Sequence, residues 1–198
     1  NWPEYRMAAR LRDNVETILR TRSGLRIAIR HNKWDAIIIE EQFIDRLYMR
    51  HFAVSSRRDP VVVDIGGYIG DFGLYCADKL GARVIIYEPT AENWAMLKKN
   101  LEMNPQFSGR VTAVNKGVAA EPEILTKVQV SGREIHASSF RYNDDASAEQ
   151  RTFLYDTLRE TLDRNDLDKV DLLKVDCEGG EYDIFAALED VSTTESLV

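Results

Sequence analysis

Cysteines are scarce in this chain, and long apolar runs are missing. The 198 residues include two cysteines, Cys76 and Cys177, so nothing indicates a disulfide framework and we expect a reducing, cytoplasmic location. No apolar stretch approaches the ~20 residues of a membrane helix, and the first ten residues lack the apolar core of a signal peptide. Internal repeats and low-complexity segments are also absent. These absences argue against a disulfide-rich secreted domain, a membrane-spanning protein and a repeat array.

An excess of positive charge is missing from most of the chain as well. The net charge is −7, with 26 Lys and Arg residues against 33 Asp and Glu residues. Residues 1–58 carry 12 basic and 7 acidic residues, whereas residues 59–198 carry 14 basic and 26 acidic residues. A nucleic-acid partner requires a basic surface, so we expect none. The arginine-rich front could contact an anionic partner or could be an ordinary solvated helix face.

The most informative stretch is residues 61–73, VVVDIGGYIGDFG. Its three valines indicate a strand buried on both faces, which is typical of a central parallel strand. Asp64, Gly66 and Gly70 then form a D-x-G-x-x-x-G turn, in which glycines permit a sharp bend and close approach of a ligand. A nicotinamide dinucleotide site, G-x-G-x-x-G, would require glycine in place of Tyr68. The pattern therefore predicts a different ligand, or a strand-to-helix turn without one.

A second buried strand covers residues 83–89 and carries Glu88 near its end, 24 positions after Asp64. This offset is that of one βαβ unit, with a helix over residues 69–80 between the strands. A carboxylate at this position can accept hydrogen bonds from both hydroxyls of a ribose. Glu88 is therefore a candidate cofactor ligand, and the alternative is a solvated residue at a strand end.

A third segment, residues 171–182 (DLLKVDCEGGEY), reads as a buried strand that ends in acids and glycines. It matches the pattern L-L-K-[IV]-D-x-E-G-x-E. Together with DIGGYIG, YEPTAENWAMLKKNL and VTAVNKGVA, it makes the chain resemble the FkbM family of methyltransferases over most of residues 26–182. Departures are glycines at Gly67 and Gly180, where the family often has alanine, and Cys177, where valine or isoleucine is usual. None removes a polar group from the expected site.

The resemblance implies an α/β protein with the Rossmann-like class I methyltransferase fold, a mostly parallel sheet in the strand order 3-2-1-4-5 with helices on both faces. It also implies S-adenosylmethionine as methyl donor, S-adenosylhomocysteine as product, and usually a hydroxyl group on a small molecule as acceptor. We expect a cap segment over residues 1–58, the methyltransferase domain over 59–198, and a β-hairpin and loop insertion at about 121–150. Such a sheet has seven strands, but only four and the start of a fifth at 195–198 are recognisable. We therefore expect roughly 40–60 further residues of helix and strand. Homo-oligomerisation stays open.

The expected site lies at the carboxyl ends of the strands, where ligands of open α/β sheets bind. The residues expected to contact the cofactor are Asp64, Gly66, Gly67, Tyr68, Gly70, Glu88, Pro89, Asn115 and Asp176.

Acids on the fourth strand are the candidate catalytic groups. Lys174, Asp176 and Glu178 alternate and so project to one face, and a buried lysine requires a partner, for which Asp176 or Glu178 is expected. Three interpretations stay open: Asp176 as general base, a divalent-cation site that includes Glu181, or a structural ion-pair cluster. We predict no metal. His136 in the insertion is a second candidate base, because its pKa suits proton transfer near neutrality.

Local patterns predict the remaining elements. We expect a helix over residues 5–20, two short strands within 25–39 joined at His31–Asn32, and a helix over 43–52. Thr90 is expected to cap a helix over 91–101, and Asp156 to cap one that ends near 165. A hairpin is expected where EILTKVQV and REIHASSF meet.

Two other functions compete with methyl transfer. A nicotinamide-dependent oxidoreductase would share the βαβ unit and the ribose-binding acid but not the glycine spacing. A non-catalytic protein could retain the cofactor fold without the activity. The acceptor itself cannot be named from the residues.

Overall fold

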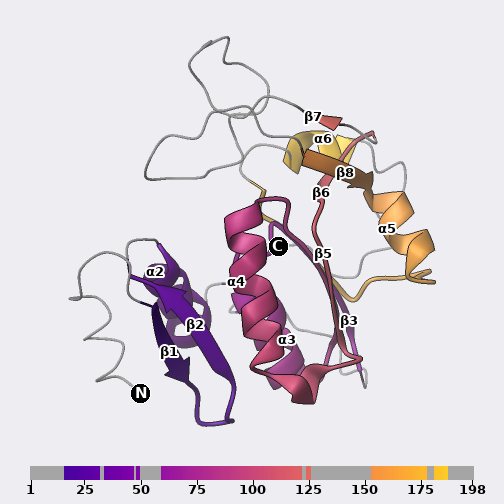
Figure 1. Ribbon diagram of the computed structural model, residues 1–198. Coiled ribbons are helices and arrows are strands. Elements are labelled where there is room, and N and C mark those ends of the chain that lie inside the picture. The colour runs from indigo at the N-terminus through magenta and orange to yellow at the C-terminus, as the bar shows by residue number, and fades with distance from the viewer. Residues whose placement is uncertain are drawn as a thin grey trace, which may run out of the picture.

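The computed structural model describes residues 16–31, 34–46, 48–49, 59–121, 124–125, 153–177 and 181–186 (Figure 1). At its centre lies a four-stranded sheet in the order β5-β4-β3-β9, in which each strand is parallel to its neighbours. The strands are β3 (Val61–Ile65), β4 (Arg83–Tyr87), β5 (Val111–Val114) and β9 (Leu172–Val175). This order is the expected 3-2-1-4, so the predicted α/β fold with a parallel sheet is confirmed.

The helices that follow the first two strands also agree with the prediction. α3 (Asp71–Leu80) connects β3 to β4, and α4 (Ala91–Glu102) precedes a 3₁₀ turn, η2 (Pro105–Phe107), that leads to β5. Thr90 occupies the N-cap position of α4, but its side chain makes no capping bond to the helix. Instead the Thr90 hydroxyl donates to the carboxylate of Glu88, so this side chain contacts a candidate site residue rather than the helix backbone.

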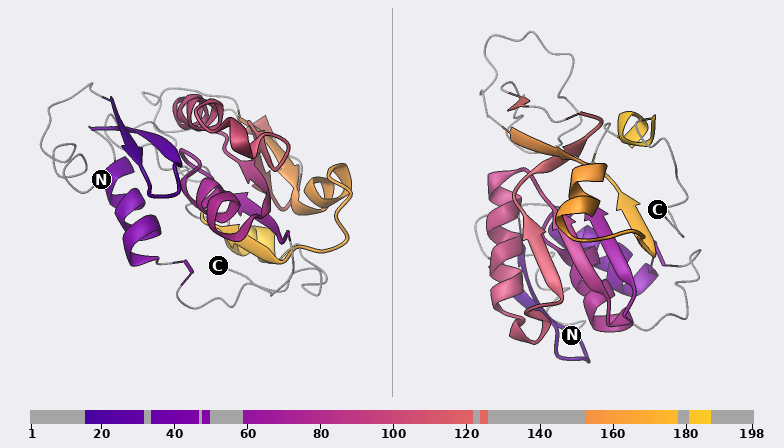
Figure 2. Two further views of the ribbon diagram at one scale, coloured as in Figure 1. Left: turned by 90° about the horizontal axis from the view of Figure 1, so that it is seen from below. Right: turned by 90° about the vertical axis from the view of Figure 1, so that its right-hand side faces the viewer.

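Two cores cover the two faces of the sheet, because its apolar residues alternate between them. Val62 and Leu172 pack with α3 and α4 on one face, whereas Val63 and Leu173 pack with α5 (Leu158–Arg164) and α6 (Glu181–Ala186) on the other. Figure 2 shows α5 and α3 on opposite sides of the strands. Helices therefore lie on both faces, as expected.

The N-terminal part differs from the prediction in three places. β1 (Glu16–Arg20) is a strand antiparallel to β2 (Arg26–Arg30), so the predicted helix over residues 5–20 is wrong for 16–20. α2 (Asp35–Glu40) is a helix where the second strand was expected, and the hairpin turn lies at residues 21–25 rather than at His31–Asn32. A π-helical turn, η1 (Glu41–Asp45), ends at Arg46 in the left-handed region, well before residue 52.

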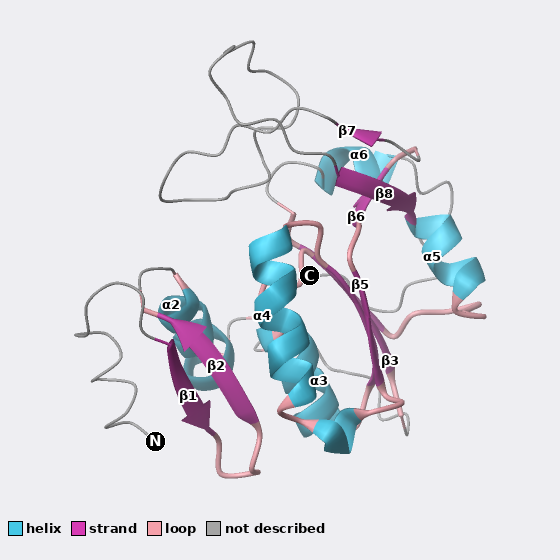
Figure 3. Cartoon of the chain, in the orientation of Figure 1, coloured by secondary structure: helices cyan, strands magenta, loops and turns pink. Residues whose placement is uncertain are grey.

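The β1–β2 hairpin lies beside α4 (Figure 3). Asn100 in α4 accepts a hydrogen bond from the N–H of Ala28 at 2.7 Å and donates to its carbonyl at 3.3 Å. Asn104, which follows the end of α4, does the same for Arg26 at 2.9 and 2.6 Å. Backbone groups at the free edge of β2 are thereby satisfied by side chains that lie far along the chain.

A smaller group of strands follows β5. β8 (Phe153–Thr157) is parallel to β6 (Gly117–Ala119) and antiparallel to β7 (Ile124–Leu125). The strand and helix expected near 153–165 are confirmed, but Thr157, not Asp156, caps α5, in a reciprocal capping box with Glu160. Asp156 instead forms ion pairs with Lys116 and Arg164. Most of the predicted hairpin, including His136, lies outside the described residues.

Both cysteines are free thiols. None of the helices within the described ranges is long and apolar enough to cross a membrane.

Candidate cofactor and active site

The carboxyl ends of the parallel strands bring the predicted site residues together. Asp64 lies in β3 and the glycine turn follows it, while Glu88 and Pro89 follow β4. Asn115 follows β5 and donates to the Glu88 carbonyl at 2.8 Å. Asp176 follows β9, and its N–H donates to Ile65 at 3.0 Å.

The glycine turn is packed too closely for side chains. Gly66 and Gly67 both donate their N–H to the carbonyl of Tyr87, at 3.1 and 2.9 Å. Gly66 has a φ of +81°, and a Cβ at this residue would lie 2.0 Å from the carbonyl oxygen of Asp176. Gly70 has a φ of +84° and is the N-cap of α3. Glycine is therefore required where the turn passes β9.

Glu88 is buried and held from two directions. Its Oε2 accepts the N–H of Tyr68 at 2.9 Å, and its Oε1 accepts both the N–H of Thr90 at 2.8 Å and the Thr90 hydroxyl. Burial raises the pKa of Glu88 to about 6, against the opposing effect of these donors. A carboxylate has about four acceptor positions, so Oε2 retains one for a ligand.

A buried ionic cluster joins β3 and β9. Asp64 and Lys174 are directly paired in the sheet register, and the Lys174 Nζ lies 3.2 Å from Asp64 Oδ1 and 3.7 Å from Asp176 Oδ2. The expected ion pair of Lys174 with Asp176 is therefore present, but among the described residues Asp64 on the neighbouring strand is the closer partner. Glu178 lies outside those residues. Burial alone would lower the pKa of Lys174, but attraction by Asp64 and Asp176 outweighs it and raises that pKa. The lysine stays charged.

One oxygen in this cluster has no partner. Asp64 is completely buried, and its Oδ2 makes no hydrogen bond among the described residues. Burial raises the pKa of Asp64 although Lys174 opposes the rise. An unpaired buried acceptor is costly. A Cβ on Gly67 would lie 2.0 Å from Cγ2 of Ile86 and 3.4 Å from this Oδ2 atom, so the side chain of Ile86 packs between the glycine turn and Asp64.

Asp176 is the exposed member of the cluster, with 46% of its side chain accessible. The hydroxyl of Tyr48 donates to its Oδ2 at 2.6 Å. The Lys174 Nζ lies 5.4 Å from the centre of the Tyr48 ring, within the range of a cation–π contact. Asp176 can therefore meet a substrate from solvent, while Tyr48 and Lys174 hold one of its oxygens.

The cluster contains more carboxyl groups than cationic groups among the described residues. Asp71, in the first turn of α3, is also buried, and burial raises its pKa to about 7. Around the single ammonium of Lys174 lie the carboxyl groups of Asp64, Asp71 and Asp176. Such surroundings favour a ligand with a positive charge.

Not every predicted catalytic residue can be placed. His136 and Glu178 lie outside the described residues, so their roles stay predictions. Glu181 accepts the N–H of Cys177 at 2.9 Å. In the described part of the chain, no group of three or more His, Cys, Asp or Glu side chains is arranged as metal ligands.

Several site residues were missed by sequence reasoning. Tyr48 contacts Asp176 although the two residues are 128 positions apart in the sequence, and no local pattern predicts this contact. Asp35 and Arg30 form an ion pair beside the glycine turn. Asp35 directly precedes four apolar residues, and an acid next to such a run could have indicated a buried carboxylate that requires a partner.

Comparisons with known proteins show which family the chain belongs to. A family model described as "Methyltransferase FkbM domain" matches residues 64–195, about two thirds of the chain. A protein named Methyltransferase sdnD, from Sordaria araneosa, is 26% identical over 181 residues, which cover 77% of this chain and 68% of that protein. Methyltransferase 1 from Beauveria bassiana is 29% identical over 171 residues, with 77% and 67% covered.

A solved structure shares the fold. It is the crystal structure of a methyltransferase FkbM from Methylobacillus flagellatus KT, with a TM-score of 0.51 and 18% sequence identity. The match covers 71% of this chain but only 32% of that one. The chain thus spans about two thirds of the two fungal relatives and about a third of this bacterial structure.

Proposed function

The chain belongs to the FkbM methyltransferase family, and we propose that it transfers a methyl group from S-adenosylmethionine to a hydroxyl group of a small molecule. The observation that carries the proposal is the convergence of Asp64, Glu88 and Asp176 around the glycine-rich turn at residues 66–70. The names of the relatives support methyl transfer in general. Oxygen as the acceptor atom rests on the arrangement of Asp176.

The residues present fit the proposed cofactor. Its ribose hydroxyls would donate to the free acceptor position of Glu88, because among the described residues Oε2 accepts only the N–H of Tyr68. The excess of carboxylates around Lys174 suits a sulfonium cation.

Asp176 is the proposed general base. When bound, S-adenosylmethionine supplies a methyl group whose bond to sulfur breaks as the bond to the acceptor oxygen forms. A neutral hydroxyl is a weak nucleophile, and Asp176 would accept its proton, which contributes ~10²–10⁴-fold. Tyr48 and Lys174 fix one carboxylate oxygen, so the other faces the acceptor.

Replacement of the carboxylate tests this role. Asp176→Asn retains the shape but not the base, and turnover should fall ~10²-fold or more, with little change in affinity for S-adenosylhomocysteine. The assay uses S-adenosylmethionine with a tritiated methyl group and a panel of sugars and other small alcohols. The matched control is Asp168→Asn, because Asp168 is an exposed acid near the opposite end of the same strand. It should behave as the parent.

Three outcomes would count against the base assignment. Full turnover of Asp176→Asn would remove Asp176 from the chemistry. A lower melting temperature with normal turnover of the folded fraction would make Asp176 a structural partner of Lys174. Loss of activity with a chelator and recovery with Mg²⁺ would indicate a metal-assisted reaction.

A further inference from the structure

Asp35 is a buried carboxylate outside the cofactor turn, and its hydrogen bonds with Tyr68 and the Arg30 side chain begin two paths that reach Glu88. It is completely inaccessible and lies in the first turn of α2. Its Oδ2 accepts the N–H and the Nε–H of Arg30, at 2.8 and 2.9 Å, and its Oδ1 accepts Arg30 Nη2 at 2.9 Å and the Tyr68 hydroxyl at 2.6 Å. An ion pair this deeply buried contributes little net stability, so its geometry invites another explanation.

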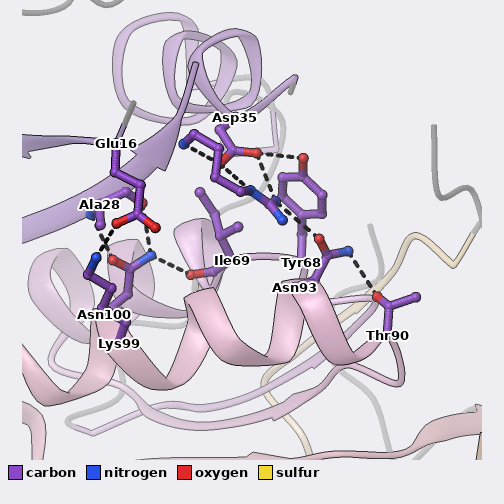
Figure 4. Close-up of polar contacts among 10 residues, drawn as sticks. Glu16, Ala28, Asp35, Tyr68, Ile69, Thr90, Asn93, Lys99 and Asn100 are labelled. Carbon is purple, nitrogen blue, oxygen red and sulfur yellow. Dashed lines mark hydrogen bonds and ion pairs between the residues drawn. The ribbon is translucent and has the colours of Figure 1, made fainter. Parts of the chain in front are cut away.

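The first path from Asp35 to the site runs through Tyr68. Figure 4 shows the Tyr68 hydroxyl pointing at Asp35. The backbone of Tyr68 has a φ of +50°, which is unusual for a residue other than glycine, and its N–H donates to Glu88 Oε2 at 2.9 Å. The guanidinium of Arg30 lies 5.3 Å from the centre of the Tyr68 ring. The side chain thus anchors a strained backbone that holds one oxygen of Glu88.

The second path runs through α4. Arg30 Nη2 donates to Asn93 Oδ1 at 3.1 Å, and Asn93 Nδ2 donates to the Thr90 hydroxyl at 2.9 Å, as the close-up also shows for Asn93 and Thr90 (Figure 4). Thr90 in turn donates to Glu88 Oε1 through both its N–H and its hydroxyl. The two paths start at one ion pair and end at different oxygens of one carboxylate.

We infer that Asp35 and Arg30 are positioning residues that orient the Glu88 carboxylate toward the ribose of the cofactor. The terminal torsion of a glutamate is broad, so a carboxylate with one oxygen fixed can still rotate, whereas one held at both oxygens presents its free acceptor position in a single direction. The inference rests on the proposed function, because it assigns the ribose to Glu88. It makes Arg30 and Asp35 part of the cofactor site rather than packing residues alone.

The test is the ability to discriminate between two ligands that differ in the ribose hydroxyls. Calorimetry with the full chain compares S-adenosylhomocysteine with its 2′,3′-dideoxyribose analogue. The parent should prefer the former by at least about tenfold, the effect of one charged hydrogen bond. Tyr68→Phe removes a single hydroxyl and should reduce this preference several-fold, and Asp35→Asn, which affects both paths, should reduce it further.

A control separates positioning from simple docking of the N-terminal segment. Asn104→Ala weakens the attachment of β2 to α4 without touching either path, so it should lower stability and leave the ligand preference unchanged. An unchanged preference in Tyr68→Phe would overturn the inference even if Asp35→Asn failed to fold. A parent that binds both ligands equally would overturn the assignment of Glu88 to the ribose. A folded parent that binds neither would overturn the proposed function itself, and this inference with it.

Discussion

Alanine at Gly66 should separate the strain of an unusual backbone from the need for close packing at the site. Gly66 has a φ of +81°, and Gly109, in the turn before β5, has a φ of +83°. A Cβ at Gly109 would meet nothing within 4 Å, whereas one at Gly66 would lie 2.0 Å from the carbonyl oxygen of Asp176. The two substitutions thus share the same conformational cost and differ in the steric contacts with the backbone of Asp176 and Cys177.

The magnitudes follow from these contacts. A left-handed conformation costs a non-glycine residue about 1–3 kcal/mol, and this is the whole expected loss for Gly109→Ala. At Gly66 the oxygen must in addition move by about 1 Å to reach a tolerable separation, and overpacking of this kind costs a further ~1–3 kcal/mol. Because the moved atom belongs to Asp176, the expected base shifts relative to the cofactor turn. A displacement of this size can reduce turnover ~10²-fold.

Urea unfolding followed by circular dichroism measures the stability difference between the two variants. Calorimetry with S-adenosylhomocysteine and the tritium assay report on the site. Gly66→Ala should be the less stable variant by ~1–3 kcal/mol and should lose turnover, while Gly109→Ala keeps it. Equal stability and equal turnover would show that the turn does not pack against β9 as described.

Two further predictions concern the buried charges. Lys174→Met leaves Asp64 buried without its counter-charge and should lower the free energy of unfolding in urea by about 3–5 kcal/mol. Adding Asp64→Asn should restore most of this stability, and no restoration would contradict the pairing. Asp71 has a folded pKa of about 7, above its ordinary value of 3.8, so the folded state binds the extra proton and stability should fall as the pH rises from about 4 to 7. Asp71→Asn should flatten this part of the stability profile, and an unchanged slope would assign it to other groups.

The central sheet was predictable because its strands carry their own signals. Runs of β-branched residues buried on both faces, with acids or glycines after them, indicate parallel strands whose ends meet at one edge. That logic places Asp64, Glu88 and Asp176 at the same edge from the sequence alone. Their individual roles toward a ligand stay predictions.

The N-terminal segment was misjudged because its structure depends on a distant helix. Apolar spacing in residues 5–20 fits a helix, but the last five of these residues pair with β2, whose own edge is bound by Asn100 and Asn104. The spacing of apolar residues in a short segment cannot predict contacts with residues that lie about 80 positions further along the chain. Tertiary contacts therefore overrode the local preference.

The predicted ion pair of Lys174 with Asp176 is present, but the closer partner, Asp64, was missed for a related reason. Alternation along one strand suggests neighbours on that strand, namely Asp176 and Glu178. The structure places Asp64 directly across from Lys174 in the adjacent parallel strand, which is closer than the next residue on the same face. Pairing register, not sequence spacing, decides such contacts.

Binding of S-adenosylhomocysteine is the most direct test of the central claim, which is that the turn at residues 64–70 and Glu88 form a cofactor site. Isothermal calorimetry on the full chain should show saturable binding. Glu88→Ala should weaken it at least tenfold while circular dichroism shows an intact fold, because charge-assisted hydrogen bonds of ~1.5–3 kcal/mol each are lost. A folded parent that releases no binding heat at millimolar ligand, or a Glu88→Ala variant that binds as tightly as the parent, would contradict the account.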